Sequence, residues 1–206
     1  MTDDTKLGLS ADPYESFARW YAEAEAAVPQ AEAMALASVD DRGRPAVRMV
    51  LYRELNAGGL TFFTNYKSSK GKELANNPQA ALLFFWQPLG RQVRVEGRVD
   101  RIDAESSSDY FATRERESQL GAWASRQSAP LGSREELLAE LEATRERFAG
   151  GEVPRPEFWG GYCLVPDRFE FWQHQDSRLH DRFAYDLMAE GGEGGESGWR
   201  MTRLAP

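Results

Sequence analysis

The chain is poor in cysteine, histidine and positive charge, and each shortage excludes a class of function. Cys163 is the only cysteine among 206 residues, so no intramolecular disulfide and no cysteine-based zinc site can form. His174 and His180 are the only histidines, and no third firm ligand accompanies them, so we predict no metal site. The 25 Lys and Arg residues are outnumbered by 33 Asp and Glu, and a formal net charge of -8 argues against binding nucleic acid through a general positive field.

Long apolar runs and common nucleotide-binding loops are also missing. No stretch approaches the length of a membrane span, and the start MTDDTKLGLS has no apolar run behind a basic segment. Neither GxGxxG nor a Walker loop occurs. We therefore predict a cytoplasmic protein with no membrane partner, folded as one domain over residues 1–206 with residues 1–11 as a flexible N-terminal arm.

Turn residues recur at short intervals and divide most of the chain into strands. An amphipathic helix is predicted from the Asp12-Pro13 start signal to near Pro29. Further helices are predicted over 68–76, 104–126 and 133–148, strands over 33–39, 44–55, 60–65, 80–86, 91–102, 158–173 and 182–187, and a flexible hairpin loop over 191–198. Gly97 interrupts an alternating strand and indicates a bulge. The pattern predicts a mainly β fold, an antiparallel barrel with peripheral helices.

Basic residues gather in one part of this acidic chain: Arg42, Arg44, Arg48, Arg53, Lys67, Lys70 and Lys72. Arg48 and Arg53 belong to a predicted strand, and one guanidinium group can donate two parallel hydrogen bonds to phosphate oxygens. Lys70 lies at the start of a short predicted helix, where backbone N–H groups also favour an anion. The cluster indicates an anion site, although solvated positions on an outer strand face are an equally simple interpretation.

Tyr110, Arg114 and Ser118 follow one another at intervals of four residues. On one continuous helix they would share a face and could surround a phosphate. Surface helices often carry the same residue types without any ligand, so the spacing alone leaves both interpretations open.

The segment FEFWQHQDSRLHDR, residues 169–182, brings a histidine and two arginines close to a tryptophan. A structural interpretation pairs the arginines with Glu170 and Asp181 and has His180 hydrogen-bonded to a carbonyl. A functional interpretation uses the basic groups and the face of Trp172 to hold an anionic aromatic ligand.

This segment resembles the signature of the pyridoxine (pyridoxamine) 5'-phosphate oxidase family. The resemblance extends, in the same order, over RMVLYR (48–53), FFTN (62–65), the SxK before a helix, RQVRVEG (91–97), SQLGAWASRQS (118–128), FWGG (158–161) and the terminal RLAP. It covers nearly the whole chain from Asp12 onward.

The resemblance implies a split β-barrel that forms a homodimer and binds FMN between its subunits. Residues at the motif positions implied to contact FMN are Arg48, Met49, Val50, Leu51, Phe63, Thr64, Lys70, Gln92, Gln127, Ser128, Trp172 and Arg182. Those implied to bind the substrate are Arg53, Tyr110, Arg114 and Ser118 at its phosphate, and Arg178, Leu179 and His180 at its ring, with Arg178 and His180 as the catalytic pair.

The implied activity is oxidation of pyridoxamine 5'-phosphate or pyridoxine 5'-phosphate to pyridoxal 5'-phosphate, with O2 as acceptor and H2O2 as product. Two alternatives remain open: a related flavin oxidase acting on another aromatic substrate, as in phenazine biosynthesis, and a non-catalytic barrel that binds flavin, haem or pyridoxal phosphate. The chain departs from the family pattern at Arg53, where lysine is usual, and at Ser69, where arginine commonly precedes the phosphate-binding lysine. Its N-terminal arm also lacks the Arg and Tyr that often cover the substrate.

Overall fold

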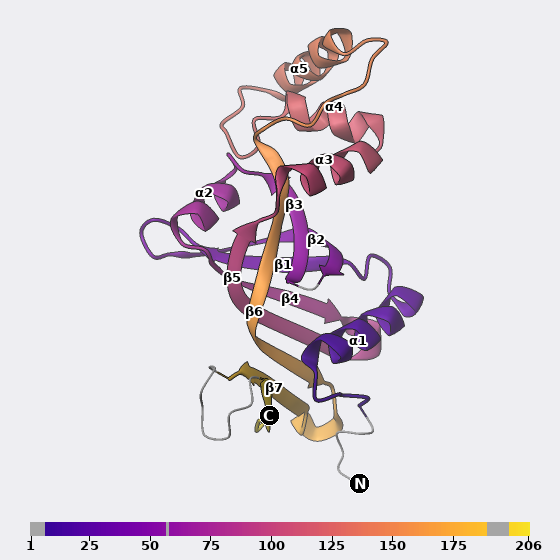
Figure 1. Cartoon of the computed structure of the whole chain (residues 1–206), viewed down its shortest axis with the longest axis vertical. Coiled ribbons are helices and arrows are strands. Elements are labelled where there is room, and N and C mark those ends of the chain that lie inside the picture. The colour runs from indigo at the N-terminus through magenta and orange to yellow at the C-terminus, as the bar shows by residue number, and fades with distance from the viewer. Residues whose placement is uncertain (1–6, 57, 189–197) are drawn as a thin grey trace.

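The computed structural model describes residues 7–56, 58–188 and 198–206 (Figure 1). Its helices are α1 (Pro13–Ala27), α2 (Ser69–Asn76), α3 (Ala104–Thr113), α4 (Arg116–Ala124) and α5 (Arg134–Arg147), with 3-10 turns η2 (Gln87–Leu89) and η3 (Asp176–Arg178). Its strands are β1 (Ala33–Val39), β2 (Pro45–Asn56), β3 (Gly59–Asn65), β4 (Gln79–Trp86), β5 (Arg91–Arg101), β6 (Trp159–Gln173), β7 (Asp181–Leu187) and β8 (Trp199–Arg203). The predicted hairpin loop over 191–198 lies outside the described residues except for Gly198.

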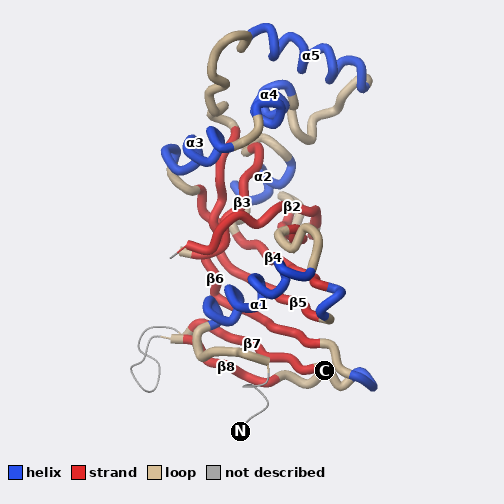
Figure 2. The backbone as a smooth tube through the Cα atoms, turned by 90° about the vertical axis from the view of Figure 1, so that its right-hand side faces the viewer, coloured by secondary structure: helices blue, strands red, loops and turns tan. Residues whose placement is uncertain are grey.

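Six strands close into an antiparallel barrel. They hydrogen-bond in the order β3-β2-β1-β4-β5-β6, and a further pairing between β3 and β6 completes the ring. The long strand β6 belongs both to the barrel and to its extension, because residues 159–164 pair with β3 and residues 168–173 pair with β7. β7 and β8 therefore extend the sheet beyond the barrel (Figure 2), and the predicted antiparallel split β-barrel is confirmed.

The irregularity predicted at Gly97 is a bulge in the facing strand, where Asp167 of β6 is the extra residue, and Gly97 lets the two strands approach closely. The β5–β6 register shifts between Glu96 and Gly97. A Cβ at Gly97 would lie 2.1 Å from the carbonyl oxygen of Val165, a distance that no side chain tolerates. Glycine is therefore required where β6 bends away from the barrel.

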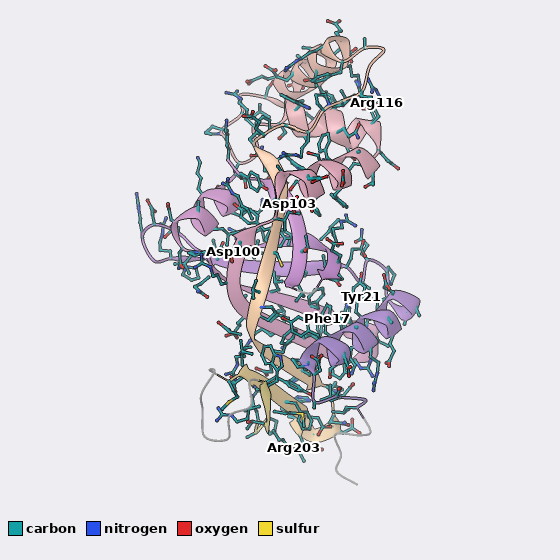
Figure 3. All side chains as sticks on the ribbon, viewed as in Figure 1. Phe17, Tyr21, Asp100, Asp103, Arg116 and Arg203 are labelled. Atoms are coloured by element: carbon teal, nitrogen blue, oxygen red, sulfur yellow. The ribbon has the colours of Figure 1, made fainter. Side chains whose placement is uncertain are left out.

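The barrel interior is filled by alternate residues of its strands and closed by α1. Asp12 caps α1 by accepting a hydrogen bond from the Tyr14 N–H, as the sequence predicted. Phe17 and Trp20 of α1 are fully buried, and Phe17 meets Phe84 of β4 edge-on with 5.1 Å between ring centroids. Figure 3 shows Phe17 and Tyr21 between α1 and the strands. Aromatic packing thus fixes α1 on the barrel.

Residues just before α1 are held against the protein. Trp20 Nε1 donates to the Leu7 carbonyl at 2.9 Å, and the Tyr185 hydroxyl donates to the Ser10 carbonyl at 2.8 Å. Leu7 and Leu9 pack on the core. Of the arm predicted to be flexible, residues 7–10 are anchored in this way, and residues 1–6 lie outside the described residues.

The helical stretch predicted over 104–126 is present as two helices rather than one continuous helix. α3 ends at Thr113 and α4 begins at Arg116, with Arg114 in extended backbone between them. No glycine or proline marks this break. Tertiary packing accounts for it, because the Arg114 guanidinium leaves the helix to lie 4.7 Å from the centre of the Trp159 ring. α3, α4 and α5 form a cap beyond one end of the barrel, around Phe111, Leu120 and Trp159 (Figures 1 and 2).

The structure also bears on membrane-spanning helices and on metal sites. Within residues 7–56, 58–188 and 198–206, no helix is long and apolar enough to cross a membrane. In the same residues, no three His, Cys, Asp or Glu side chains lie together as a metal site requires.

Candidate functional site

A cavity of about 290 Å³ opens where the barrel meets the helical cap. Its lining comes from strands β2 and β3, from α2 and α3, from the α3–α4 junction, and from Trp159 at the start of β6. Ten residues predicted from the sequence line it: Met49, Val50, Leu51, Arg53, Phe63, Thr64, Lys70, Tyr110, Arg114 and Gln127. The fold therefore gathers residues that lie up to 78 positions apart in the sequence.

A second cavity of about 260 Å³ adjoins the first, and the two share Arg114, Gln127 and Trp159. Ser118 lines this second cavity. Tyr110, Arg114 and Ser118 do not share one helix. Arg114 nevertheless lines both cavities, the first together with Tyr110 and the second together with Ser118.

Parallel aromatic rings form one wall of the first cavity. The Phe63 and Tyr110 rings stack with 3.8 Å between centroids, and Phe63 also stacks on Trp159 at 5.4 Å. Sequence reasoning did not assign Trp159 to the site, although the FWGG segment that contains it was part of the family resemblance. Its position at the end of a strand that runs the length of the molecule is a property of the fold.

Two arginines near this wall have no carboxylate partner. Arg114 is half-buried, and its Nη1 is buried without a hydrogen-bond partner among the described residues. Burial lowers the pKa of the Arg114 guanidinium, which the Tyr110 side chain opposes and nearby Arg53 reinforces. Arg53 lies 6.0 Å from the centre of the Tyr110 ring and makes no ion pair with any described residue. Two neighbouring cations without a counter-ion are suited to bind an anion.

Lys70 provides a third unpaired cation on another side of the cavity. Ser68 caps α2 by accepting from the Gly71 N–H, and Lys70 follows in the first turn. Lys70 Nζ donates to Gln127 Oε1 at 2.8 Å and to Thr64 Oγ1 at 3.3 Å. Burial lowers the Lys70 pKa, nearby Arg48 lowers it further, and Glu73 opposes both effects. A desolvated ammonium at a helix N-terminus, joined to a hydroxyl and an amide, fits a phosphate group.

Arg48 lies behind this group rather than on the cavity wall. Its guanidinium donates to Glu73 at 2.6 Å and also to the Ser38 hydroxyl. The ion pair with Glu73 was not predicted, because 25 residues separate the partners and no local pattern links them. Ser128 follows Gln127 with a left-handed backbone (φ 67°) and faces other cavities that contain Ser69 and Glu136.

The remaining predicted residues lie at the opposite end of the molecule. Gln92 of β5, Trp172 of β6 and Arg182 of β7 are direct neighbours across the sheet. Arg182 is held by the buried carboxylate of Glu170 at 2.8 Å, as the structural interpretation of the motif predicted, whereas Asp181 pairs with Arg203 rather than with an arginine of the motif. Arg178, Leu179 and His180 occupy the turn between β6 and β7, where Arg178 is exposed.

The structural interpretation expected His180 to hydrogen-bond a carbonyl, and the structure shows a different partner. The His180 Nδ1 accepts a hydrogen bond from the Gln175 N–H at 3.1 Å. The imidazole centroid lies 4.6 Å from that of the Trp172 ring. The imidazole therefore lies against the tryptophan that the resemblance linked to the cofactor, with the two rings tilted by 45°.

Within one chain these two groups of residues lie far apart along β6. Trp172 lies thirteen residues beyond Trp159 on the same strand, which corresponds to about 40 Å of extended chain. Figures 1 and 2 show the helical cap and β7 at opposite ends of β6.

One outer face of the sheet runs from the first group to the second, and its part on β2 and β4 is apolar. Val47, Met49 and Leu51 point outward from β2 with 71%, 64% and 40% of their surface exposed, and Phe85 of β4 is 57% exposed. Leu51 is paired with Ala33, Phe85 with Gln92, and Gln92 with Trp172, so the face continues to Trp172. Exposed apolar surface of this kind is typical of a protein interface.

Fold and site together define a split-barrel flavoprotein. The model of the family "Pyridoxamine 5'-phosphate oxidase" matches residues 21–148, and that of the "Pyridoxine 5'-phosphate oxidase C-terminal dimerisation region" matches residues 159–206. The chain belongs to the pyridoxamine 5'-phosphate oxidase family. This confirms the resemblance seen in the sequence and the prediction of FMN as cofactor, and the unpaired cation Lys70 with its polar neighbours fits the phosphate of that cofactor.

Relatives and solved structures agree with this assignment. The pyridoxine/pyridoxamine 5'-phosphate oxidases of Bordetella pertussis and Bordetella avium are 50% and 52% identical to the chain over 198 residues, 96% of this chain and 90% of theirs. The structure is also similar to PhzG from Burkholderia lata 383 in complex with tetrahydrophenazine-1-carboxylic acid, with a TM-score of 0.88 and 28% identity over 100% of this chain and 98% of that one. A pyridoxamine 5'-phosphate oxidase-related, FMN binding protein from Nostoc punctiforme shares the fold, with a TM-score of 0.73 and 16% identity over 97% and 100% of the two chains.

Proposed function

We propose that the chain is an oxidase that uses FMN to convert pyridoxamine 5'-phosphate or pyridoxine 5'-phosphate into pyridoxal 5'-phosphate, with O2 reduced to H2O2. The observation that carries this proposal is the pair of uncompensated guanidiniums, Arg53 and Arg114, beside the Tyr110 ring. A substrate phosphate would supply the missing negative charge and would also reach the Ser118 hydroxyl through the adjoining cavity.

FMN would be held by other residues of the same cavity. Lys70 would bind its phosphate, with Thr64 and Gln127 completing the polar contacts and Arg48, fixed by Glu73, behind them. Met49, Val50, Leu51 and Phe63 would contact the cofactor along β2 and β3, and Ser128, Gln92, Trp172 and Arg182 would complete its surroundings. When bound, FMN supplies the acceptor for the hydride that leaves the substrate carbon.

The complete site would need two copies of the chain. The distance between the cavity and the turn that carries Arg178, Leu179 and His180 supports a homodimer in which the turn of one copy reaches the cavity of the other. The apolar face around Val47 and Phe85 supplies a surface for that contact, and it contains Met49 and Leu51, which also line the cavity. A two-fold dimer would form two equivalent sites.

Arg178 and His180 would orient the substrate ring against the cofactor. The His180 Nδ1 accepts a hydrogen bond, so in the neutral imidazole the hydrogen lies on Nε2, which can donate to the oxygen on the ring. Arg178 has a left-handed backbone (φ 61°), and a strained residue of this kind at a turn is common in ligand sites. Its planar cation would cover the ring and bond the alcohol or amine that is oxidised.

A phenazine-type oxidase is the second candidate, and the similarity to PhzG favours it. Such a substrate carries a carboxylate rather than a phosphate, and the two uncompensated arginines favour the more highly charged group. A barrel that only binds flavin, haem or pyridoxal phosphate remains the third candidate, and the residues at the β6–β7 turn argue against it.

The phosphate requirement gives a direct test of substrate class. We expect kcat/KM to be far higher for pyridoxine 5'-phosphate than for pyridoxine. Arg114→Met, which retains an apolar side chain beside Trp159, should lower kcat/KM for the phosphorylated substrate roughly 10- to 100-fold and barely change it for pyridoxine. Equal losses for both substrates would contradict the assignment of Arg114 to the phosphate. Turnover of a phenazine carboxylate alone would favour the second candidate.

A further inference from the structure

The turn between β6 and β7 adopts a backbone that its own residues do not favour. Ser177 and Arg178 are consecutive non-glycine residues in the left-handed region, with φ of 57° and 61°. Each such residue raises the energy of the backbone, so contacts around the turn must hold it in place.

Contacts on two sides hold this turn. On one side the His174 N–H donates to the Gly90 carbonyl of the η2 turn at 2.7 Å. On the other side the Gln175 amide donates through Nε2 to Asp181 Oδ2 at 2.7 Å, and Arg203 Nη1 donates to Asp181 Oδ1 at 2.8 Å. Figure 3 shows Arg203 at this end of the molecule. The Asp181 carboxylate thus joins the turn to strands β7 and β8.

Gln175 also contacts the imidazole directly. Its backbone N–H donates to His180 Nδ1, so one residue is bonded to Asp181 through its side chain and to His180 through its main chain. A nitrogen that accepts a hydrogen bond carries no hydrogen in the neutral imidazole, which leaves the hydrogen on Nε2.

We propose that Gln175 is a positioning residue that fixes the tautomer and orientation of His180, and that Asp181 and Arg203 anchor it in that role. The inference rests on the proposed function in one respect, the identity of the substrate that accepts the hydrogen bond from Nε2. Without the side-chain bond to Asp181, the Gln175 backbone is free to turn away from Nδ1, and the two neutral tautomers become closer in population. A hydrogen bond of ordinary strength changes such a ratio about fivefold.

The test is a nitrogen NMR measurement on the FMN-loaded protein labelled with [15N]histidine. The chain has only two histidines, so His174→Gln leaves the ring signals of His180 alone. At pH about 8.5, where an ordinary imidazole is neutral, we expect the wild-type ring to carry its hydrogen on Nε2. Gln175→Ala should shift the tautomer ratio about fivefold toward Nδ1–H and lower kcat for pyridoxine 5'-phosphate by a similar factor, with the dissociation constant of FMN unchanged.

Two further variants separate positioning from general damage to the turn. Gln175→Lys restores a donor to Asp181 and should restore the wild-type tautomer. Asp176→Ala removes a neighbouring side chain that has no hydrogen bond or ion pair with the described residues, and it should leave the tautomer unchanged.

A wild-type hydrogen on Nδ1, or a tautomer ratio that Gln175→Ala does not alter, would overturn the inference even in an active enzyme. A ratio that responds to Gln175→Ala in a protein that does not oxidise pyridoxine 5'-phosphate would support the positioning role and contradict the proposed substrate instead.

Discussion

At the scale of single residues, the site is defined by cations that lack partners. Many arginines of the described chain pair with acids, as Arg182 does with Glu170 and Arg168 with Asp186. Arg53 and Arg114 line one cavity without a carboxylate partner, and Arg114 has a buried nitrogen without an acceptor among the described residues. A half-buried cation without a partner raises the free energy of the folded protein, so its presence here is explained if a ligand supplies the negative charge.

Arg178 and His180 allow a prediction about the rate of substrate turnover. Arg178→Ala or His180→Ala removes a contact to the substrate ring, and we expect turnover to fall roughly tenfold or more while FMN binding stays within about twofold. Steady-state kinetics and a fluorescence titration with FMN measure the two effects. Unchanged turnover in both variants would contradict the roles assigned to them.

Ser69 allows a prediction about cofactor affinity. It is the first residue of α2, directly before Lys70, and its side chain is exposed. Ser69→Arg would add a second cation near the cofactor phosphate, and one charge-assisted hydrogen bond should tighten FMN binding about tenfold. Ser69→Gln has comparable reach without the charge and serves as the control. An FMN dissociation constant that is the same in all three proteins would mean that Ser69 does not face that phosphate.

At the scale of elements, local signals predicted the ends of helices and the bulge, because those features depend on neighbouring residues. Asp12 caps α1 and Gly97 marks the bulge, as the sequence indicated. The break between α3 and α4 could not be predicted, because its cause is the contact between Arg114 and Trp159, 45 residues apart. The ion pair of Arg48 with Glu73 escaped prediction for the same reason.

Helix α1 should contribute strongly to stability through one buried ring. Phe17 is fully buried among Tyr21, Tyr52 and Phe84. Phe17→Ala should lower the free energy of unfolding by about 3–5 kcal/mol, since it removes the ring and leaves a cavity. Urea unfolding at fixed protein concentration measures the change, with Ala18→Ser on the exposed side of the same helix as control. A loss below about 1 kcal/mol would mean that α1 is not packed as described.

At the scale of the whole molecule, the fold places the two groups of predicted site residues at opposite ends of β6. The family resemblance predicted that the cofactor lies between subunits, and the length of β6 supplies a physical reason for that expectation. Val47→Glu places a charge in the middle of the apolar outer face, where the native side chain is 71% exposed in the single chain. Burying an unpaired charge is unfavourable, so we expect dissociation to monomers and loss of activity.

Sedimentation velocity measures the assembly state of that variant. Leu138→Glu, on the exposed side of α5, is the matched control and should remain dimeric. A Val47→Glu protein that stays dimeric and active would show that this face is not the interface.

The central claim is that this barrel transfers a hydride from a phosphorylated pyridine to its flavin. The most direct measurement adds pyridoxine 5'-phosphate to the FMN-loaded protein without oxygen and follows the flavin absorbance. We expect the yellow colour to bleach and to return when air is admitted, with pyridoxal 5'-phosphate formed. A flavin that stays yellow while the phosphorylated substrate is bound would contradict the account.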